Sequence, residues 1–520
     1  MNSVFEIFSR AAEVHSERAW LSVTSETAAA YGIEPGDISY AQAHDAVLRL
    51  RAQYAETGYA PGHRVGLLLE NRPAFFVHWF ALNALGVSIV PINPDLRIIE
   101  LSYVIAHSEL VAIVAIPSRH AALSEAANGS IPITAPDDMP VPVTRSGSAH
   151  DEAALLYTSG TTGRPKGCVL PDEYFLAAGA WYSGLTGLGT MRVGQERMLT
   201  PLPLFHMNAL AYSAMAMLMT GGCLIPLDRF HPRSWWRTVR DSRATIIHYL
   251  GVMPAILMAD PVSDDDLAHT VRFGFGAGVD GKLHAPFEQR FGFPLIEAWA
   301  MTETGAGAVI AAHQEPRHIG TYCFGRPAPE VETRIVHEDG SEAEQGELLV
   351  RHAGTDPHYG FFREYLKDPD ATAEAWEGLW FHTGDVVRRG PDGSMHFVDR
   401  RKNVIRRSGE NIAAVEVESA LRQHPAVTAV AVAPTADPVR GEEVFACIVT
   451  NAEPAEALAR DIAAWCVERL AYYKAPGFIA FVPNLPLTST QKIQRGELRT
   501  LVASLTVTAH DTRALKRRPA

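Results

Sequence analysis

Short apolar runs alternate with helix-length segments through the first half of the chain. HRVGLLLE (63–70) and VSIVPINP (87–94) have the valine, isoleucine and leucine content of buried strands, and residues 71–86 between them fit a helix that ends at Gly86. The same alternation returns at 102–117, 196–203, 223–228, 243–252, 270–278 and 293–299. Buried strands separated by helices are typical of parallel sheets that are covered on both faces. The pattern predicts an α/β fold with a large N-terminal body of stacked α/β sheets.

The pattern changes after about residue 320. Turn sequences at 338–340 and 391–393 separate alternating strands, which is typical of hairpins and predicts a β-rich subdomain. Helices expected at 415–425 and 456–471 then alternate with strands expected at 426–434, 442–450 and 477–483. We therefore expect two domains, residues 1–400 and residues 401–520, and the second is a small α+β domain, for which the resemblance described below implies mobility.

The net charge and the uncharged stretch at 208–227 bear on two classes of partner, nucleic acids and membranes. The 520 residues include 46 Lys and Arg against 59 Asp and Glu, a net charge of −13, which argues against nucleic-acid binding. The basic residues Arg513, Lys516, Arg517 and Arg518 are expected to form a frayed terminus. Residues 208–227 carry no charge, but the pair Gly221-Gly222 interrupts them, so a buried helix, a turn and a buried strand are predicted in place of a membrane span.

The cysteines indicate the compartment. Five cysteines are scattered along the chain without a CxxC pair. Such a set is typical of reduced thiols, and we expect a cytoplasmic protein. A homodimer is left open by the sequence.

The segment YTSGTTGRPKG at 157–167 has the chemistry of a phosphate-binding loop. Its glycines allow close approach of the backbone, while its hydroxyl groups, free N–H groups and lysine suit phosphate oxygens. It is not a Walker A loop, because Gly160 and Gly163 are too close and Lys166 is followed by Gly167. The predicted phosphate-binding residues are Thr158, Ser159, Gly160, Thr161, Thr162, Gly163 and Lys166.

This segment resembles the signature loop of the adenylate-forming enzymes, which include acyl-CoA synthetases, peptide-synthetase adenylation domains and luciferases. Further segments resemble motifs of that family and follow in the family's order: AWAMTE (298–303), WFHTGD (380–385), DRRKN (399–403), SGENI (408–412) and PLTSTQKIQR (486–495). The resemblance runs from about residue 20 to about residue 505. It departs from the family at Trp299, Ala300 and Gln491, which stand where the family has Tyr, Gly and Gly.

The resemblance implies a role for each matching residue. Lys492 would enter the active site for adenylation, Glu303 would bind Mg²⁺, and His206 would lie between the ATP and thioester sites. Lys402 would be the hinge between the domains, and the loop of Ser408, Gly409 and Glu410 would close over coenzyme A. The further ATP-binding residues implied are Gly276, Ala277, Gly278, Glu297, Ala298, Trp299, Thr302, Asp385 and Arg400.

A second fingerprint competes with this interpretation. Gly276, Gly278 and Gly281 match G-x-G-x-x-G, and Glu297 follows 21 residues after Gly276. Such a turn with its acidic residue is typical of dinucleotide binding and would indicate a nicotinamide-dependent oxidoreductase. That alternative is less favoured, because it leaves the hydroxyl-rich loop at 157–167 without a role.

The resemblance implies an ATP-dependent acyl-CoA ligase, an AMP-forming acid–thiol ligase that uses ATP, Mg²⁺ and coenzyme A. A stand-alone adenylation enzyme that loads a carrier protein remains an alternative. The acyl pocket is expected near Trp181, Tyr182, Met207, Asn208, His248, Tyr249, Val279 and Ala300. These residues favour a small or compact carboxylic acid, and the C-terminal motifs most resemble the crotonobetaine/carnitine–CoA ligase branch, although benzoate-like acids also fit.

Overall fold

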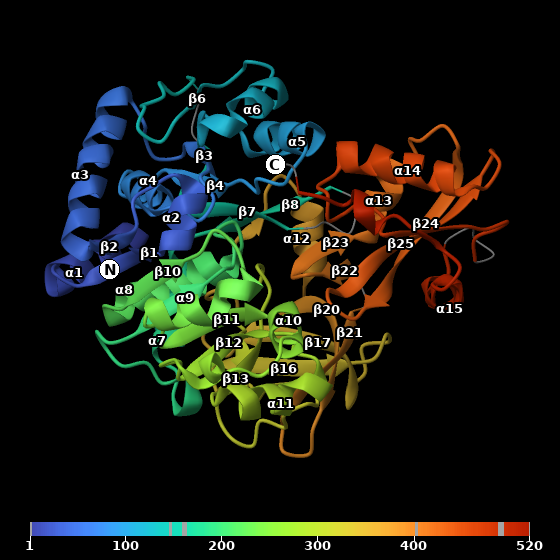
Figure 1. The fold of residues 1–520 in the computed structure, drawn as a ribbon. Coiled ribbons are helices and arrows are strands. Elements are labelled where there is room, and N and C mark those ends of the chain that lie inside the picture. Colours follow the sequence, from blue (N-terminus) through green and yellow to red (C-terminus); the bar gives the residue numbers. More distant parts are fainter. Residues whose placement is uncertain (1–2, 145–147, 159–163, 401–403, 487–492, 519–520) are drawn as a thin grey trace.

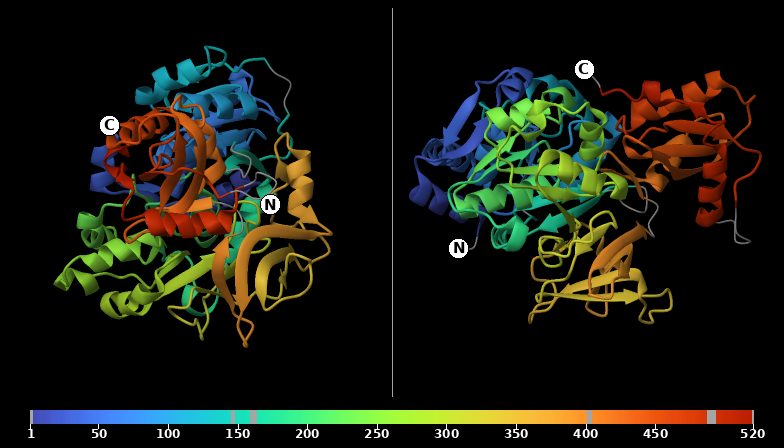
Figure 2. Two further views of the ribbon diagram at one scale, coloured as in Figure 1. Left: turned by 90° about the vertical axis from the view of Figure 1, so that its right-hand side faces the viewer. Right: turned by 60° about the horizontal axis from the view of Figure 1, so that its bottom comes forward.

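The computed structural model describes residues 3–144, 148–158, 164–400, 404–486 and 493–518. Two sheets with their helices form the body, a third sheet lies beside them, and the residues after 404 form a small domain at one side (Figures 1 and 2). This architecture confirms the predicted fold class. The predicted division between residues 400 and 401 falls between two strands and stays a prediction.

The first body sheet contains the strands predicted at 63–70 and 87–94. Its order is β18-β8-β7-β4-β3-β5-β6, and β7, β4, β3, β5 and β6 run parallel. Its strands are β3 (Arg64–Leu68), β4 (Ser88–Pro91), β5 (Ala112–Ala115), β6 (Ile133–Thr134), β7 (Ala154–Thr158), β8 (Lys166–Leu170) and β18 (Glu364–Tyr365). The intervening helices are α4 (Pro73–Asn83), α5 (Ile98–Ser108) and α6 (His120–Ala126). Helix α4 begins at Pro73, whose fixed φ suits a first helical position.

The second body sheet joins segments that are distant in sequence. Its order is β14-β13-β12-β11-β9-β10-β1-β2, and Leu21 of β1 pairs with Leu224 of β10. Its strands are β1 (Ala19–Val23), β2 (Gly36–Ser39), β9 (Arg197–Thr200), β10 (Cys223–Pro226), β11 (Ile246–Leu250), β12 (Phe273–Ala277), β13 (Leu295–Trp299) and β14 (Ile310–Ala311). The helices are α1 (Val4–His15), α2 (Ser25–Tyr31), α3 (Tyr40–Thr57), α7 (Asp172–Ser183), α8 (Ala214–Thr220), α9 (Trp235–Asp241), α10 (Val252–Ala259) and α11 (Gly281–Phe291).

The uncharged stretch 208–227 folds as the sequence predicts. A π-helix over Asn208–Ser213 continues into α8, Gly221 turns the chain with φ 63°, and β10 follows. In the described ranges, no helix is long and apolar enough to cross a membrane.

The third sheet is the β-rich subdomain. Its order is β15-β21-β20-β17-β16, with β19 on β20, and its strand pairs are antiparallel. Its strands are β15 (Cys323–Gly325), β16 (Val331–Val336), β17 (Gln345–His352), β19 (Trp376–Glu377), β20 (Trp380–Arg389) and β21 (Met395–Arg400). Helix α12 (Pro369–Ala375) precedes β19. Gly340 and Gly393 have φ near 80° in the two predicted hairpin turns, a conformation that glycine adopts readily.

The small domain has its own core. Its sheet has the order β23-β22-β25-β26-β27, with β24 on β25. Helices α13 and α14 pack on this sheet around a core that includes Val432, Ile448 and, from α14, Ile462. Its elements are β22 (Val404–Arg407), β23 (Glu410–Ala413), α13 (Ala414–Leu421), β24 (Val427–Asp437), β25 (Gly441–Thr450), α14 (Glu456–Arg469), β26 (Phe478–Phe481), α15 (Arg495–Leu505) and β27 (His510–Asp511).

The prediction that the basic C-terminal residues fray is wrong. Lys516 forms an ion pair with Glu443, which is fully buried, and Arg518 Nε donates to Asp95 Oδ1 of the body over 2.8 Å. A buried carboxylate needs a cationic partner, so Glu443 holds the end of the chain against the domain.

Candidate active site

A cleft lies where the small domain meets the carboxyl ends of parallel strands from both body sheets. Its walls include Thr158 at the end of β7, Leu250 at the end of β11 and Ala277 at the end of β12. Gly409 and Glu410 of the small domain complete it. Ligands of open α/β sheets bind at such strand ends, so this cleft is the candidate active site.

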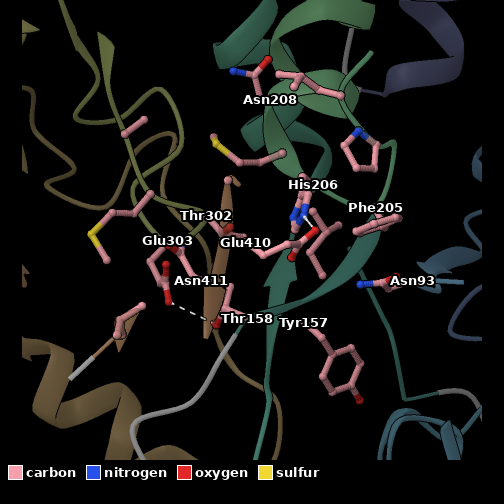
Figure 3. A pocket seen from close by; sticks show the side chains of 18 of the residues that line it. Asn93, Tyr157, Thr158, Phe205, His206, Asn208, Thr302, Glu303, Glu410 and Asn411 are labelled. Atoms are coloured by element: carbon pink, nitrogen blue, oxygen red, sulfur yellow. Dashed lines mark hydrogen bonds and ion pairs between the residues drawn. The ribbon is translucent and has the colours of Figure 1, made fainter. Parts of the chain in front are cut away.

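A carboxylate that accepts two hydroxyl hydrogen bonds lies at one end of the cleft (Figure 3). Thr158 Oγ1 donates to Glu303 Oε1 over 3.5 Å, and the Tyr365 hydroxyl donates to the same oxygen over 2.9 Å. Burial, and then the adjacent Glu303 charge, raises the pKa of Tyr365, which therefore stays a donor. Lys166 Nζ lies 4.7 Å from the centre of the Tyr365 ring. The resemblance implies that Thr158 and Lys166 bind ATP and that Glu303 binds Mg²⁺, so we call these residues and Tyr365 the nucleotide end of the cleft.

The loop between Thr158 and Lys166 begins and ends beside Glu303. Thr158 pairs with Lys166 across β7 and β8, so the loop joins two adjacent antiparallel strands. Ser159, Gly160, Thr161, Thr162 and Gly163 lie outside the described residues, and so do Lys402 and Lys492. Their predicted roles stay predictions.

Asp385 lines the cleft next to Trp299, one of the predicted ATP-binding residues. Trp299 Nε1 donates to Asp385 Oδ2 over 2.9 Å, and Asp385 pairs with Arg400 in the backbone register of β20 and β21. Ala298, Ala300 and Thr302 also line the cleft. Trp299 is only 6% exposed and lies behind the described lining, held by this hydrogen bond.

The glycine-rich turn after β12 is held by Glu297. Its carboxylate accepts from Gly278 N over 2.8 Å and from the Tyr249 hydroxyl over 2.7 Å. Gly276 and Ala277 line the cleft, whereas Glu297 lies beneath the turn and is buried. A Cβ on Gly276 would lie 2.2 Å from the Tyr249 carbonyl oxygen, so contact between strands is enough to require glycine here. A carboxylate occupied in this way is poorly placed to bind a ribose, which argues against the oxidoreductase alternative.

The small domain reaches the cleft through Gly409 and Glu410, of which Glu410 is labelled in Figure 3. His206 Nε2 lies 3.3 Å from Glu410 Oε1. Burial alone would raise the pKa of Glu410, but His206 and then Lys474 outweigh it and hold this pKa below its ordinary value. Gly409 has φ 89°, and a Cβ there would lie 2.1 Å from Leu250 Cδ1. Glycine is therefore required at this contact between the domains.

A buried ion-pair network connects the same two domains. Lys474 Nζ lies 2.6 Å from Glu100 Oε1 of helix α5 and 2.7 Å from Glu416 Oε1 of helix α13. Burial lowers the pKa of Lys474, but Glu416 and Glu100 outweigh burial and raise it above its ordinary value. Asn93 Nδ2 also donates to the Tyr473 hydroxyl over 3.0 Å. These contacts fix the small domain in the arrangement that places Glu410 beside His206.

A model of the AMP-binding enzyme family matches residues 13–360, and a model of the AMP-binding enzyme C-terminal domain matches residues 416–492. The first match covers more than half of the chain. This protein belongs to the AMP-binding enzyme family. Membership confirms the resemblance to adenylate-forming enzymes that the motifs predicted.

Individual relatives of this AMP-binding enzyme are similar over most of their length. Crotonobetaine/carnitine–CoA ligases of Citrobacter koseri and Escherichia coli are each 30% identical, over 491 and 495 residues, which cover 89% of this chain and 93% of theirs. The solved o-succinylbenzoate CoA synthetase of Bacillus subtilis superposes with a TM-score of 0.81 at 23% identity, over 96% of this chain and 98% of that chain. A malonyl-CoA ligase superposes with a TM-score of 0.73 at 29% identity, over 90% and 97% of the two chains.

Neutral side chains line the opposite end of the cleft of this AMP-binding enzyme, and we call it the acyl end after the acyl pocket that the resemblance predicts there. Met207, Asn208 and Ala300, all predicted pocket residues, line the cleft together with Tyr212 and Phe275. Asn208 lies far from Thr158 and Glu303 in Figure 3, with His206 and Glu410 between them. The other predicted pocket residues lie behind the described lining: Trp181, Tyr182, His248, Tyr249 and Val279.

Sequence reasoning missed Tyr365 and Lys474 in this AMP-binding enzyme. Tyr365 lies in no motif, and only the pairing of β18 with β8 brings it to Glu303. Lys474 carried a signal, because a lone lysine in the apolar segment LAYYKAP (470–476) is expected to need a buried carboxylate partner.

The nucleotide end has the composition of a magnesium–phosphate site. Mg²⁺ is commonly bound through one or two carboxylates together with phosphate oxygens and water. Glu303 offers one such carboxylate, and no group of three or more His, Cys, Asp or Glu side chains arranged for a metal occurs among the described residues. The donor set therefore fits Mg²⁺ that arrives with a nucleotide.

Proposed function

We propose that this protein is an ATP-dependent acyl-CoA ligase that activates a small or compact carboxylic acid and releases AMP and pyrophosphate. Family membership and the relatives named as CoA ligases support the acid–thiol ligase activity. The observation that carries the proposal is the meeting of three groups in one cleft. These are Glu303 with Thr158, Asp385, which also lines the cleft, and the Glu410 loop of the small domain.

The first half-reaction joins the acid to the nucleotide. A carboxylate oxygen attacks the α-phosphorus of ATP, the bond to the β-phosphate oxygen breaks, and acyl-AMP and pyrophosphate form. The loop from Thr158 to Lys166 would hold the β- and γ-phosphates, Asp385 the ribose, and Lys492 the incoming carboxylate and α-phosphate. Held by Glu303, Mg²⁺ would neutralise part of the phosphate charge. Positioned cations and donors stabilise charge that spreads over the phosphate in the transition state.

The second half-reaction transfers the acyl group. The deprotonated thiol of coenzyme A attacks the acyl carbon, and the bond to AMP breaks. The arrangement with Glu410 beside His206 suits this step, because the Ser408–Glu410 loop then faces the cleft between its two ends. A rotation of the small domain between the two steps lets one cleft serve both reactions.

The test measures AMP and pyrophosphate release from Mg·ATP with a panel of short, aromatic and polar acids, with and without coenzyme A. We expect AMP release that needs both an acid and coenzyme A, and we expect Glu303→Gln to abolish most of it. Pyrophosphate exchange without any effect of coenzyme A would instead indicate a carrier-protein loader. Reduction of a nicotinamide without AMP formation would overturn the proposal. The predicted cytoplasmic location and homodimer stay predictions.

A further inference from the structure

A chain of buried polar groups lies behind the acyl end of the cleft. The Tyr182 hydroxyl lies 2.9 Å from His248 Nε2, and His248 Nδ1 lies 2.6 Å from Asn208 Oδ1. Ser213 Oγ lies 3.0 Å from the same Nδ1 and 3.2 Å from the Asn208 carbonyl oxygen. Tyr182 comes from α7, His248 from β11, and Asn208 begins the π-helix, so three separate elements build the chain.

His248 carries one proton, because burial keeps it neutral. His248 and Tyr182 are both 0% exposed. Burial lowers the pKa of His248 to about 3, so the ring is uncharged at neutral pH. A neutral imidazole donates from one nitrogen and accepts at the other.

Tyr182 decides which nitrogen carries that proton. A buried phenol must donate its hydrogen bond or lose free energy, and in the described ranges His248 Nε2 is the acceptor within reach of its hydroxyl. Nε2 is therefore the accepting nitrogen, and the proton lies on Nδ1. The Nδ1–H group then donates to Asn208 Oδ1, since an amide oxygen can only accept.

The orientation of the Asn208 amide follows from this proton. Its oxygen is held against His248, so its NH₂ group is left for the cleft. No described residue accepts a hydrogen bond from Asn208 Nδ2, although Asn208 is half-buried and lines the cleft. π-helical turns such as Asn208–Ser213 occur frequently at functional sites.

The surroundings of Asn208 are neutral and apolar. Met207, Tyr212 and Phe275 line the cleft beside it. The aromatic rings pack on one another, with centroids 4.5 Å apart for Tyr182 and Phe275 and 5.6 Å apart for Trp181 and Tyr212. A quaternary ammonium group is bound by several open aromatic faces, and Trp181 and Tyr182, which are not part of the described lining, offer none to the cleft.

We infer that Asn208 is a specificity-determining residue that donates a hydrogen bond to a neutral acceptor on the acid, and that His248 and Tyr182 act as positioning residues. The acceptor is a carbonyl, ether or hydroxyl oxygen or a ring nitrogen, located away from the reacting carboxylate. This inference rests on the proposed ligase function. It distinguishes the protein from its relatives, because crotonobetaine and carnitine carry a quaternary ammonium group.

Matched acids test the inference. Pyridine-3-carboxylate and pyridine-4-carboxylate are compared with benzoate, 4-oxopentanoate with hexanoate, and crotonobetaine serves as the cationic acid. We expect at least one acceptor acid to exceed its matched partner about tenfold or more in kcat/KM for AMP release, and crotonobetaine to be a poor substrate. Such a ratio is typical when a buried donor would otherwise stay unpaired.

Two variants separate recognition from packing. Asn208→Leu, which is close in size and apolar, should abolish the preference for acceptor acids while benzoate and hexanoate still react. Tyr182→Phe removes the hydrogen bond that holds the His248 ring at Nε2, so it should weaken the preference and leave the fold intact by circular dichroism. A merely structural role for Tyr182 would lower the rates of all acids equally.

The outcomes distinguish failure of the Asn208 inference from failure of the proposed ligase function. Equal rates within every pair, or an unchanged ratio in Asn208→Leu, would overturn the inference while the ligase function stands. Efficient use of crotonobetaine by the wild type would also overturn it. Failure of all acids to release AMP, in an enzyme that folds and binds ATP, would count against the proposed function itself.

Discussion

Three of the four side chains at the nucleotide end of the cleft, those of Thr158, Lys166 and Glu303, come from short sequence motifs, whereas the acyl end is built from neutral side chains contributed by separate elements. Thr158 and Lys166 flank one loop, and Glu303 lies four residues after the end of β13. Asn208 faces the cleft, but its orientation depends on His248, 40 residues away, and Tyr182. The phosphate groups of ATP are the same whichever acid is activated, so the residues that bind them can follow one sequence pattern. Recognition of a particular acid depends on the shape of the acyl end and on the direction in which hydrogen-bond donors point. Both are defined only by the packing of side chains from different elements.

The largest expected effect follows from the adenylation role proposed for Lys492. Lys492→Ala should slow acyl-AMP formation by at least about 10²-fold, because a positioned charge on the transition state is lost. Thioester formation from supplied acyl-AMP should remain largely intact. The measurement is pyrophosphate exchange beside single-turnover thioester formation, with Lys282→Ala, an exposed lysine on α11, as the control.

This variant also sharpens the comparison between the two ends. The ratio of kcat/KM between two acids should not change in Lys492→Ala, because the acyl end is untouched. Equal loss in both half-reactions would contradict the role assigned to Lys492.

A smaller effect is expected at the contact between the domains, which belongs to neither end. Glu100→Gln removes one charged partner of Lys474, and hydrogen bonds to charged groups contribute about 1.5–3 kcal/mol. We therefore expect thioester formation to slow about tenfold while adenylation is spared, since the contact holds the Glu410 arrangement.

Half-reaction rates measure this effect, with Glu125→Gln, an exposed glutamate on α6, as the control. Adenylation that falls in parallel with thioester formation would show that the contact does not select between the two arrangements.

Two buried histidines, His248 behind the acyl end and His78 of helix α4, should make the free energy of unfolding depend on pH. Burial lowers the pKa of His248 to about 3 and that of His78 to about 4, so neither folded ring binds a proton between pH 6.5 and about 4. The unfolded rings do bind protons below about pH 6.5, so the free energy of unfolding should fall as the pH falls through this window. Each ring contributes up to about 1.4 kcal/mol per pH unit.

Urea unfolding at pH 7 and pH 5 measures this dependence. His248→Gln should reduce the change between the two pH values, and His358→Gln, at an exposed position, should leave it as in the wild type. The same pH dependence in His248→Gln and the wild type would contradict a neutral, buried His248.

The smallest effect is expected from Ala300→Gly. Removal of one methyl group from the acyl end should widen acid tolerance by about fourfold for bulkier acids, since a buried methylene is worth about 0.8 kcal/mol. The KM for ATP should not change. Substrate profiles for the two proteins measure this, and identical profiles would mean that Ala300 does not contact the acid.

Most of the body could be predicted from the sequence because buried parallel strands leave continuous apolar runs. The predictions at 63–70 and 87–94 correspond to β3 and β4, and the uncharged stretch 208–227 folds as predicted. The place of β1 beside β10 could not be predicted, because pairing over about 200 residues leaves no local pattern. The ordered C-terminal residues were missed for a similar reason, since Glu443 and Asp95 that hold them lie elsewhere in the chain.

The sequence by itself determined the family and the α/β class, and it predicted where the family's motifs lie, because these depend on residue types at fixed local spacing. Only the tertiary structure decided that Tyr365 joins Glu303, that Glu297 holds a turn, and that Lys474 joins two domains. It also decided which way the Asn208 amide faces. A hydrogen bond between distant segments depends on where the fold places them, and a proton's position depends on every buried partner around it.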